Sequence, residues 1–202
     1  MRYNPQTQNV ELSVAELCLL SLGAGEYKSS VADKNATLEM TQICDAYNPF
    51  LSVVKSFPFW GRNIRLSADV DGILDALGGV RVDLVRAVSD KAFSKKPSEE
   101  LWAYIKCCAW LVCLRDGLDV VYTRVVFKNL ENGAFREYEK KIYTSELEIF
   151  VKALLSKITL RINHAVKHET FVRPSALDLP FPYGEIREGQ DEMMRGVSTV
   201  IR

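Results

Sequence analysis

The sequence lacks net charge, long apolar runs and a leader-like start, and each absence narrows what the protein can be. Its 26 Lys and Arg residues equal its 26 Asp and Glu residues, so no overall charge attracts nucleic acid or an acidic membrane. The polar start, Met1 to Val10, has no signal-peptide pattern, and no apolar run approaches the length of a membrane span. We therefore expect a cytoplasmic protein with no membrane partner, in which any DNA contact comes from a local basic patch.

Metal-binding cysteine patterns are also missing. The five cysteines include no CxxC pair, and the adjacent Cys107 and Cys108 would face different sides of a helix. Their odd number and apolar surroundings predict small buried residues in a reducing compartment. The alternative, an iron–sulfur or zinc site, lacks the usual ligand spacing.

Helix signals are clear at several points of the 202-residue chain. Ser13 and Glu16 form a reciprocal capping box, and Ser145 starts a second one with the glutamate three residues later. Ser98 and Gly117 bracket the strongest helical pattern, with acids in its first turn. We expect helices over 13–23, within 36–47, over 98–117 and over 145–166.

Strand signals lie between these helices. Residues 63–70 alternate apolar and polar side chains, and the turn at Gly78-Gly79 predicts a hairpin into a central strand over 80–88. Asn132-Gly133 predicts a second hairpin, whose charged outer strand suits a sheet edge. Residues 56–61, with Pro58 and Gly61, are interpreted as a connector.

The expected order, α-α-β-β-β-α-β-β-α, indicates an α/β fold with a mixed sheet flanked by helices. After His168 the composition changes: Pro174, Pro180 and Pro182 favour an extended linker. A candidate helix over 187–201 follows that linker. We expect one domain plus a short appendage.

Two stretches resemble known families. The element order with "ADVDGI" (68–73) on a hairpin strand is similar to the RecB-like branch of the PD-(D/E)XK nucleases, whose pattern runs G-x-x-D-G-[IV], E-x-K and Q-x-x-x-Y. This resemblance implies a restriction-endonuclease-like domain over 1–170. The tail "LPFPYGEIREGQDEMM" resembles the entry to the core of XPD/DinG-like superfamily-2 DNA helicases, which implies that 171–202 is a linker and the start of a helicase core.

The helicase resemblance brings further expectations. The chain ends before any phosphate-binding loop, so we expect a piece of a larger protein with the helicase core in cis. In that parent, ATP would be the cofactor, with Gln190 reading the adenine edge and Tyr183 and Arg187 lining its pocket. For the isolated chain no cofactor is expected.

The nuclease resemblance can be tested residue by residue. Such enzymes hold Mg²⁺ with carboxylates and support the attacking water with a lysine. Asp71 takes the place of the first aspartate. In one register Leu84 replaces the metal-binding glutamate and Arg86 replaces the lysine; in the other, Asp83 supplies the acid but Val85 stands at the lysine position. No single register supplies both groups.

The helix positions are also altered. The glutamine and tyrosine of the family fall on Tyr104 and Cys108, or in the neighbouring register on Lys106 and Trp110. A degenerate nuclease is therefore the main hypothesis, with Asp71 as the one plausible metal ligand that remains. Arg86 could still hold a phosphate by charge and hydrogen bonds.

Three functions remain open from the sequence. The first is an inactive nuclease-like domain of a DNA helicase that guides single-stranded or forked DNA or braces the motor, with DNA contacts from Lys91, Lys95 and Lys96. The second is an active Mg²⁺-dependent DNA nuclease with a rearranged site of Asp71, Asp83 and Lys106. The third is a structural or partner-binding domain with no role on DNA.

Overall fold

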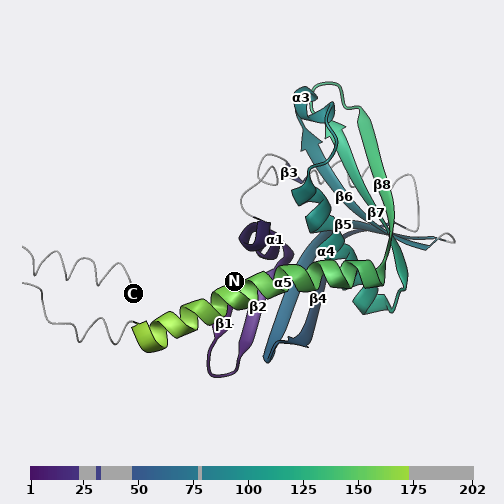
Figure 1. The fold of residues 1–202 in the computed structure, drawn as a ribbon. Coiled ribbons are helices and arrows are strands. Elements are labelled where there is room, and N and C mark those ends of the chain that lie inside the picture. The colour runs from purple at the N-terminus through teal and green to yellow at the C-terminus, as the bar shows by residue number, and fades with distance from the viewer. Residues whose placement is uncertain (23–30, 33–46, 77–78, 173–202) are drawn as a thin grey trace, which may run out of the picture. The chain divides into compact units, whose positions relative to one another are not determined.

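The computed structural model describes residues 1–22, 31–32, 47–76 and 79–172 (Figure 1). The chain divides into two compact units, Met1–Leu160 and Arg161–Arg202. The strands are β1 (Arg2–Asn4), β2 (Asn9–Ser13), β3 (Val31–Ala32), β4 (Tyr47–Phe59), β5 (Arg62–Ala76), β6 (Gly79–Val88), β7 (Val120–Asn129) and β8 (Phe135–Tyr143). The helices are α1 (Val14–Leu22), α3 (Asp90–Phe93), α4 (Glu99–Asp116), α5 (Thr144–Lys167) and a π-helix, η2 (His168–Val172).

One mixed sheet joins all eight described strands. β4, β5 and β6 form an antiparallel meander, and β6 then pairs in parallel with β7 through the crossover helix α4. β7 pairs antiparallel with the charged strand β8, which has no second partner among the described strands. The expected α/β class, a mixed sheet flanked by helices, is confirmed, and so is the central place of β6.

The strand β4 corrects one expectation. Residues 56–59 belong to β4 rather than to a connector, and the turn to β5 is confined to Trp60 and Gly61. Pro58 indicated a connector because proline has no backbone N–H to donate to a neighbouring strand. β4 pairs only with β5 among the described strands, however, and proline is tolerated on a strand with a free edge. The N-terminal strands β1 and β2 were not predicted; β2 pairs in parallel with the first half of β5.

The helix α4 forms the centre of the core. Every residue from Leu101 to Cys113 is buried except Lys106. β4, β5, β6 and β7 contact one side of α4, and α1 contacts it as well. Ser98 caps α4 as predicted, because its hydroxyl accepts a hydrogen bond from the Leu101 amide at 3.4 Å. This buried helix fixes the side chains that face β5 and β6.

The flanking helices follow their sequence signals closely. At α1, the Ser13 amide donates to the Glu16 carboxylate at 2.8 Å and the Glu16 amide donates to the Ser13 hydroxyl at 3.2 Å, so the capping box is confirmed. α5 begins at Thr144, one residue before the predicted cap. The helix expected within 36–47 lies outside the described residues except for Tyr47, which begins β4 instead, and the helix expected over 187–201 and the extended linker before it lie outside them as well. Among the described helices, none combines the length and apolar character needed to cross a membrane.

The C-terminus of α4 yields a first stability prediction. Gly117 adopts a left-handed conformation, φ 67° and ψ 39°, and its amide donates to the Cys113 carbonyl at 2.8 Å. A Cβ added there would meet no atom within 4 Å, so only backbone strain opposes a side chain. Gly117→Ala should therefore lower the free energy of unfolding by about 1 kcal/mol. Urea denaturation measures this loss, and Gly117→Asn, which tolerates the left-handed region better, should lose less.

Candidate functional site

The candidate site is centred on an ion pair between adjacent strands. The Arg86 guanidinium of β6 donates to the Asp71 carboxylate of β5 over 2.6 Å, and the same nitrogen donates to the Val85 carbonyl over 2.7 Å. Both side chains are largely shielded, with 6% of Arg86 and 15% of Asp71 exposed. Arg86 thus neutralises Asp71, the aspartate that the sequence suggested as a metal ligand.

The backbone explains why Asp71 is placed there. The β5–β6 ladder runs from Ala76↔Gly79 to Gly72↔Asp83 and then stops. Beyond this point the Asp71 carboxylate, rather than a main-chain carbonyl, accepts the Val85 amide at 2.8 Å. A buried amide without an acceptor would be costly. Asp71 therefore has a structural role that is independent of any metal.

The helix α4 closes the other side of this ion pair. The Tyr104 ring lies 5.9 Å from the Arg86 guanidinium carbon, and its hydroxyl donates to the Asp69 carbonyl at 3.0 Å. Burial raises the pKa of the Cys108 thiol well above its ordinary value, and the charge of Asp71 adds to this rise. A buried thiol that stays protonated is poorly suited to nucleophilic attack.

The helix residues suggested by the sequence lie in different surroundings. Tyr104 and Cys108 are the helix residues near Asp71 and Arg86, whereas Trp110 packs edge-on against Phe57 at 5.1 Å. The four described cysteines, Cys18, Cys107, Cys108 and Cys113, are buried free thiols as predicted. Cys44 lies outside the described residues.

Asp83 belongs to a different cluster, because alternate residues of β6 point to opposite faces. Its carboxylate is fully buried and receives two hydrogen bonds from Arg124 of β7, at 3.1 and 2.5 Å, and one from Arg81 at 3.1 Å. Glu137 of β8 pairs with Arg124 at 3.0 Å, and Glu139 lies 3.7 Å from Arg81. Sequence reasoning missed this network, since β7 and β8 contribute residues far along the chain.

The Arg124 guanidinium remains charged in this cluster. Burial lowers its pKa, but the hydrogen bond and charge of Asp83, with the charge of Glu137, outweigh that effect and leave the pKa above its ordinary value. These ion pairs connect β6, β7 and β8 and stabilise the pairing of the three strands. Asp83 therefore does not point to the side of the sheet that carries Arg86.

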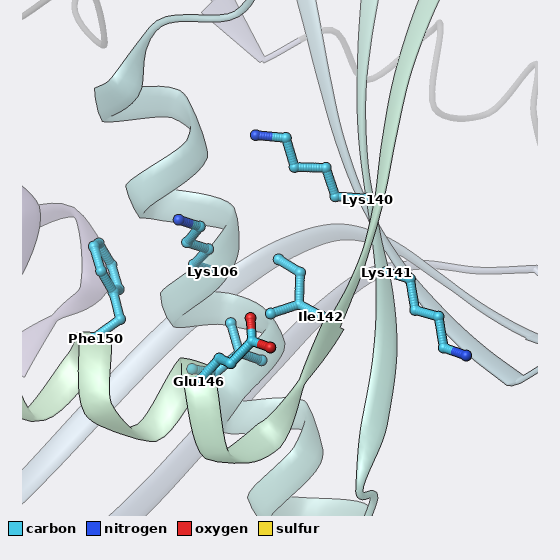
Figure 2. Close-up of a pocket in the computed structure, with 7 residues that line it drawn as sticks. Lys106, Lys140, Lys141, Ile142, Glu146 and Phe150 are labelled. Carbon is cyan, nitrogen blue, oxygen red and sulfur yellow. The ribbon is translucent and has the colours of Figure 1, made fainter.

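Lys106 occupies a third place. Its ammonium nitrogen lies 4.9 Å from the centroid of the Phe150 ring of α5, and it lines a pocket formed by α4, β8 and α5 (Figure 2). Lys106 lies two residues after Tyr104, and this spacing rotates its side chain by more than half a turn around the helix axis. The structure therefore brings Asp71 and Arg86 together but does not bring Asp83 or Lys106 to them.

The three candidate DNA-binding lysines lie at one end of the sheet. Lys91 is in α3, and Lys95 and Lys96 are in the segment before α4; all three are exposed. Arg136 of β8 donates to the Phe93 carbonyl at 2.9 Å with its guanidinium 4.7 Å from the Phe93 ring, so the segment is fastened to the sheet. No ion pair with a described residue engages the three lysine ammonium groups.

A divalent cation does not fit the described surroundings of Asp71. Mg²⁺ needs several oxygen ligands, but Leu84 offers only a buried aliphatic side chain and Arg86 holds a fixed positive charge against the carboxylate. Within the described ranges, no three His, Cys, Asp or Glu side chains form a group that could hold a metal. Tyr183, Arg187 and Gln190, expected to bind nucleotide in a full-length helicase, lie outside the described residues.

Comparison with known proteins gives structural neighbours only. No protein-family model and no curated protein matches the sequence. An alkaline exonuclease (LHK-Exo) from Laribacter hongkongensis has a TM-score of 0.48 and 9% identity, covering 80% of this chain and 94% of that chain. Its complex with dAMP has a TM-score of 0.46 and 9% identity, with 78% and 92% covered.

A third solved structure, that of SSO0001, has a TM-score of 0.47 and 9% identity, covering 72% of this chain and 75% of that chain. The likeness in all three cases concerns the course of the backbone. The roles of individual side chains must be argued from the contacts of this chain itself.

Proposed function

We propose that this chain is a nuclease-like domain that binds DNA without cleaving it and that lies N-terminal to the motor of a DNA helicase. The observation that carries the proposal is the buried ion pair of Arg86 with Asp71. A carboxylate already shared by a guanidinium and a backbone amide is a poor metal ligand. Without a metal, none of the described groups beside Asp71 can generate the hydroxide that phosphodiester cleavage needs.

DNA contact is assigned to Lys91, Lys95 and Lys96. Three exposed ammonium groups in one short segment can neutralise phosphates and release counterions, even though the chain as a whole has no net charge. The anchoring of this segment to β8 through Arg136 lowers the ordering cost of binding. Guidance of single-stranded or forked DNA towards a motor in cis is the role that fits a binding site without hydrolysis.

The helicase parent is the finer part of the proposal. Tyr183, Arg187 and Gln190 would contact ATP only in a chain that contains the motor, and ATP is the cofactor of that parent. The tail resemblance is the support for this part. A reading frame that continues into a phosphate-binding loop would establish it.

The proposal is tested by incubating the chain with labelled single-stranded DNA and Mg²⁺ or Mn²⁺. We expect no metal-dependent cleavage, but we expect DNA binding that weakens as salt rises. Changing Lys91, Lys95 and Lys96 together to Gln should reduce the salt slope by about two, roughly 0.7 for each phosphate of the single strand that is no longer neutralised. Lys157→Gln, Lys152→Gln and Lys167→Gln combined are a control that removes the same amount of charge.

Two results would contradict this proposal. Turnover with a divalent cation that disappears in Asp71→Ala would establish an active nuclease. DNA binding that is undetectable at low salt, or equal in the triple variant and its control, would leave a structural or partner-binding domain as the better account.

A further inference from the structure

A pocket separate from the Asp71–Arg86 pair lies where α4, β8 and the start of α5 meet (Figure 2). Its volume is about 340 Å³, which is in the range of small-molecule sites. Ile142, Leu147 and Phe150 provide apolar walls, while charged side chains stand at its border. A pocket with apolar walls and a few charged groups suits a ligand that is part apolar and part ionic.

Lys106 is the first charged group of this pocket. It is the one residue between Leu101 and Cys113 that is not buried, and it is the one charged residue in that stretch. The ammonium lies above the Phe150 ring, and no carboxylate among the described residues pairs with it. The Phe150 ring stabilises the ammonium without balancing its charge, so an anionic ligand would supply the counter-charge.

Lys140 provides the second cation. Its ammonium lies 3.9 Å from the centroid of the Trp102 ring of α4, which holds the side chain on the α4 side of β8. Figure 2 shows Lys141 pointing away from Lys106 and Lys140, as alternation along a strand requires. Lys106 of α4 and Lys140 of β8 therefore face the pocket, whereas the ammonium of Lys141 points away from them (Figure 2).

Glu146 limits the affinity of the pocket for an anion. Its carboxylate lies on the same side of β8 as Lys106 and Lys140 in Figure 2, yet no ion pair joins it to a described lysine. It stands in the first turn of α5, where an acid is favoured by the helix dipole. An anion bound by the lysines would be repelled by this carboxylate, so affinity should rise when its charge is removed.

We propose that this pocket binds the phosphate group of a nucleotide, held by Lys106 and Lys140, with the base against Phe150, Leu147 and Ile142. Ammonium groups form charge-assisted hydrogen bonds with phosphate oxygens, and an aromatic ring offers a stacking surface to any base. The phosphate can belong to a free nucleotide or to the end of a DNA strand. The site goes beyond the proposed function, because it does not use the lysines at 91, 95 and 96.

Amide chemical shifts of the full chain, titrated with adenosine monophosphate, test the proposal. We expect the shifts to concentrate on α4, on β8 and on the first turns of α5, with adenosine and inorganic phosphate each binding more weakly. Lys106→Met and Lys140→Met should each weaken binding by about tenfold, since each removes one charge-assisted hydrogen bond. Glu146→Gln should tighten binding by about threefold, because the repulsion of the phosphate is removed.

Lys141→Met is the matched control, because it removes the same charge from the next residue of β8 and should change affinity by less than about twofold. Lys106→Arg, which keeps the charge, separates a binding defect from a folding defect. Equal losses of affinity in Lys141→Met and Lys140→Met, or no shifts at these residues, would overturn the proposal. Oligonucleotides with and without a 5′-phosphate distinguish a strand end from a free nucleotide.

The outcome is independent of the DNA-binding proposal. Changing Lys91, Lys95 and Lys96 should leave adenosine monophosphate binding unchanged, whereas loss of binding in that variant would assign the shifts to another site. Failure at the pocket with intact salt-sensitive DNA binding would remove this inference alone.

Discussion

Replacing Asp83 with alanine should lower the free energy of unfolding by about 3–5 kcal/mol, among the largest effects of any single change in this chain. Asp83 is fully buried and accepts hydrogen bonds from both Arg124 and Arg81. Without it, the largely buried Arg124 loses both hydrogen bonds to Asp83, and its ion pair with Glu137 compensates little because that side chain is half exposed and screened by solvent. A guanidinium cannot relieve this cost by giving up its proton.

Urea denaturation measures the effect, with Asp75→Ala as the control. Asp75 is an exposed aspartate of β5 with no ion pair to a described residue, so its replacement should cost less than about 0.5 kcal/mol. Asp83→Asn should lie between the two, because an amide oxygen can still accept from one arginine. A decrease below about 1 kcal/mol in Asp83→Ala would contradict the structural role of Asp83; that bound is roughly the value of an ordinary exposed ion pair.

The elements that local chemistry specifies were predictable from the sequence. Ser13 and Ser98 cap their helices through their own side chains, and alternation along 63–70 follows from burial of one strand face. Pro58 shows the limit of such rules, because whether a proline ends a strand depends on which strands lie beside it. Sheet neighbours are set by residues far apart in the chain, so sequence signals of short range do not reveal them.

The candidate site shows the same division. The nuclease resemblance predicted that the glutamate and lysine positions hold Leu84 and Arg86 or, in the other register, Asp83 and Val85. The direct pairing of Arg86 with Asp71 was not visible in the sequence, because it depends on the point where the β5–β6 ladder stops. The role of Asp83 was also hidden, since its partner Arg124 is 41 positions later in the sequence. Charge pairs across strands need a register before they can be assigned.

The Asp71–Arg86 pair carries the second large prediction. Arg86→Met should lower the free energy of unfolding by about 3 kcal/mol, because it leaves the Asp71 carboxylate shielded and without its cation. Asp71→Asn should cost about 2–3 kcal/mol, since the amide oxygen can still accept from the Val85 amide but Arg86 loses its anion. The double variant should be destabilised by less than the sum, which gives a coupling energy of about 2 kcal/mol.

The sign of the Asp71→Asn effect separates a scaffold from an active centre. Catalytic acids are held in arrangements that lower stability, so their replacement in a metal-free enzyme often stabilises the fold. Here the carboxylate is compensated by Arg86 and by a backbone amide, and its replacement should destabilise the fold. Urea denaturation of the three variants, with and without Mg²⁺, measures the change in the free energy of unfolding and any stabilisation by the metal. A gain in stability for Asp71→Asn, or stabilisation of the unaltered chain by Mg²⁺ that Asp71→Asn abolishes, would restore the metal site.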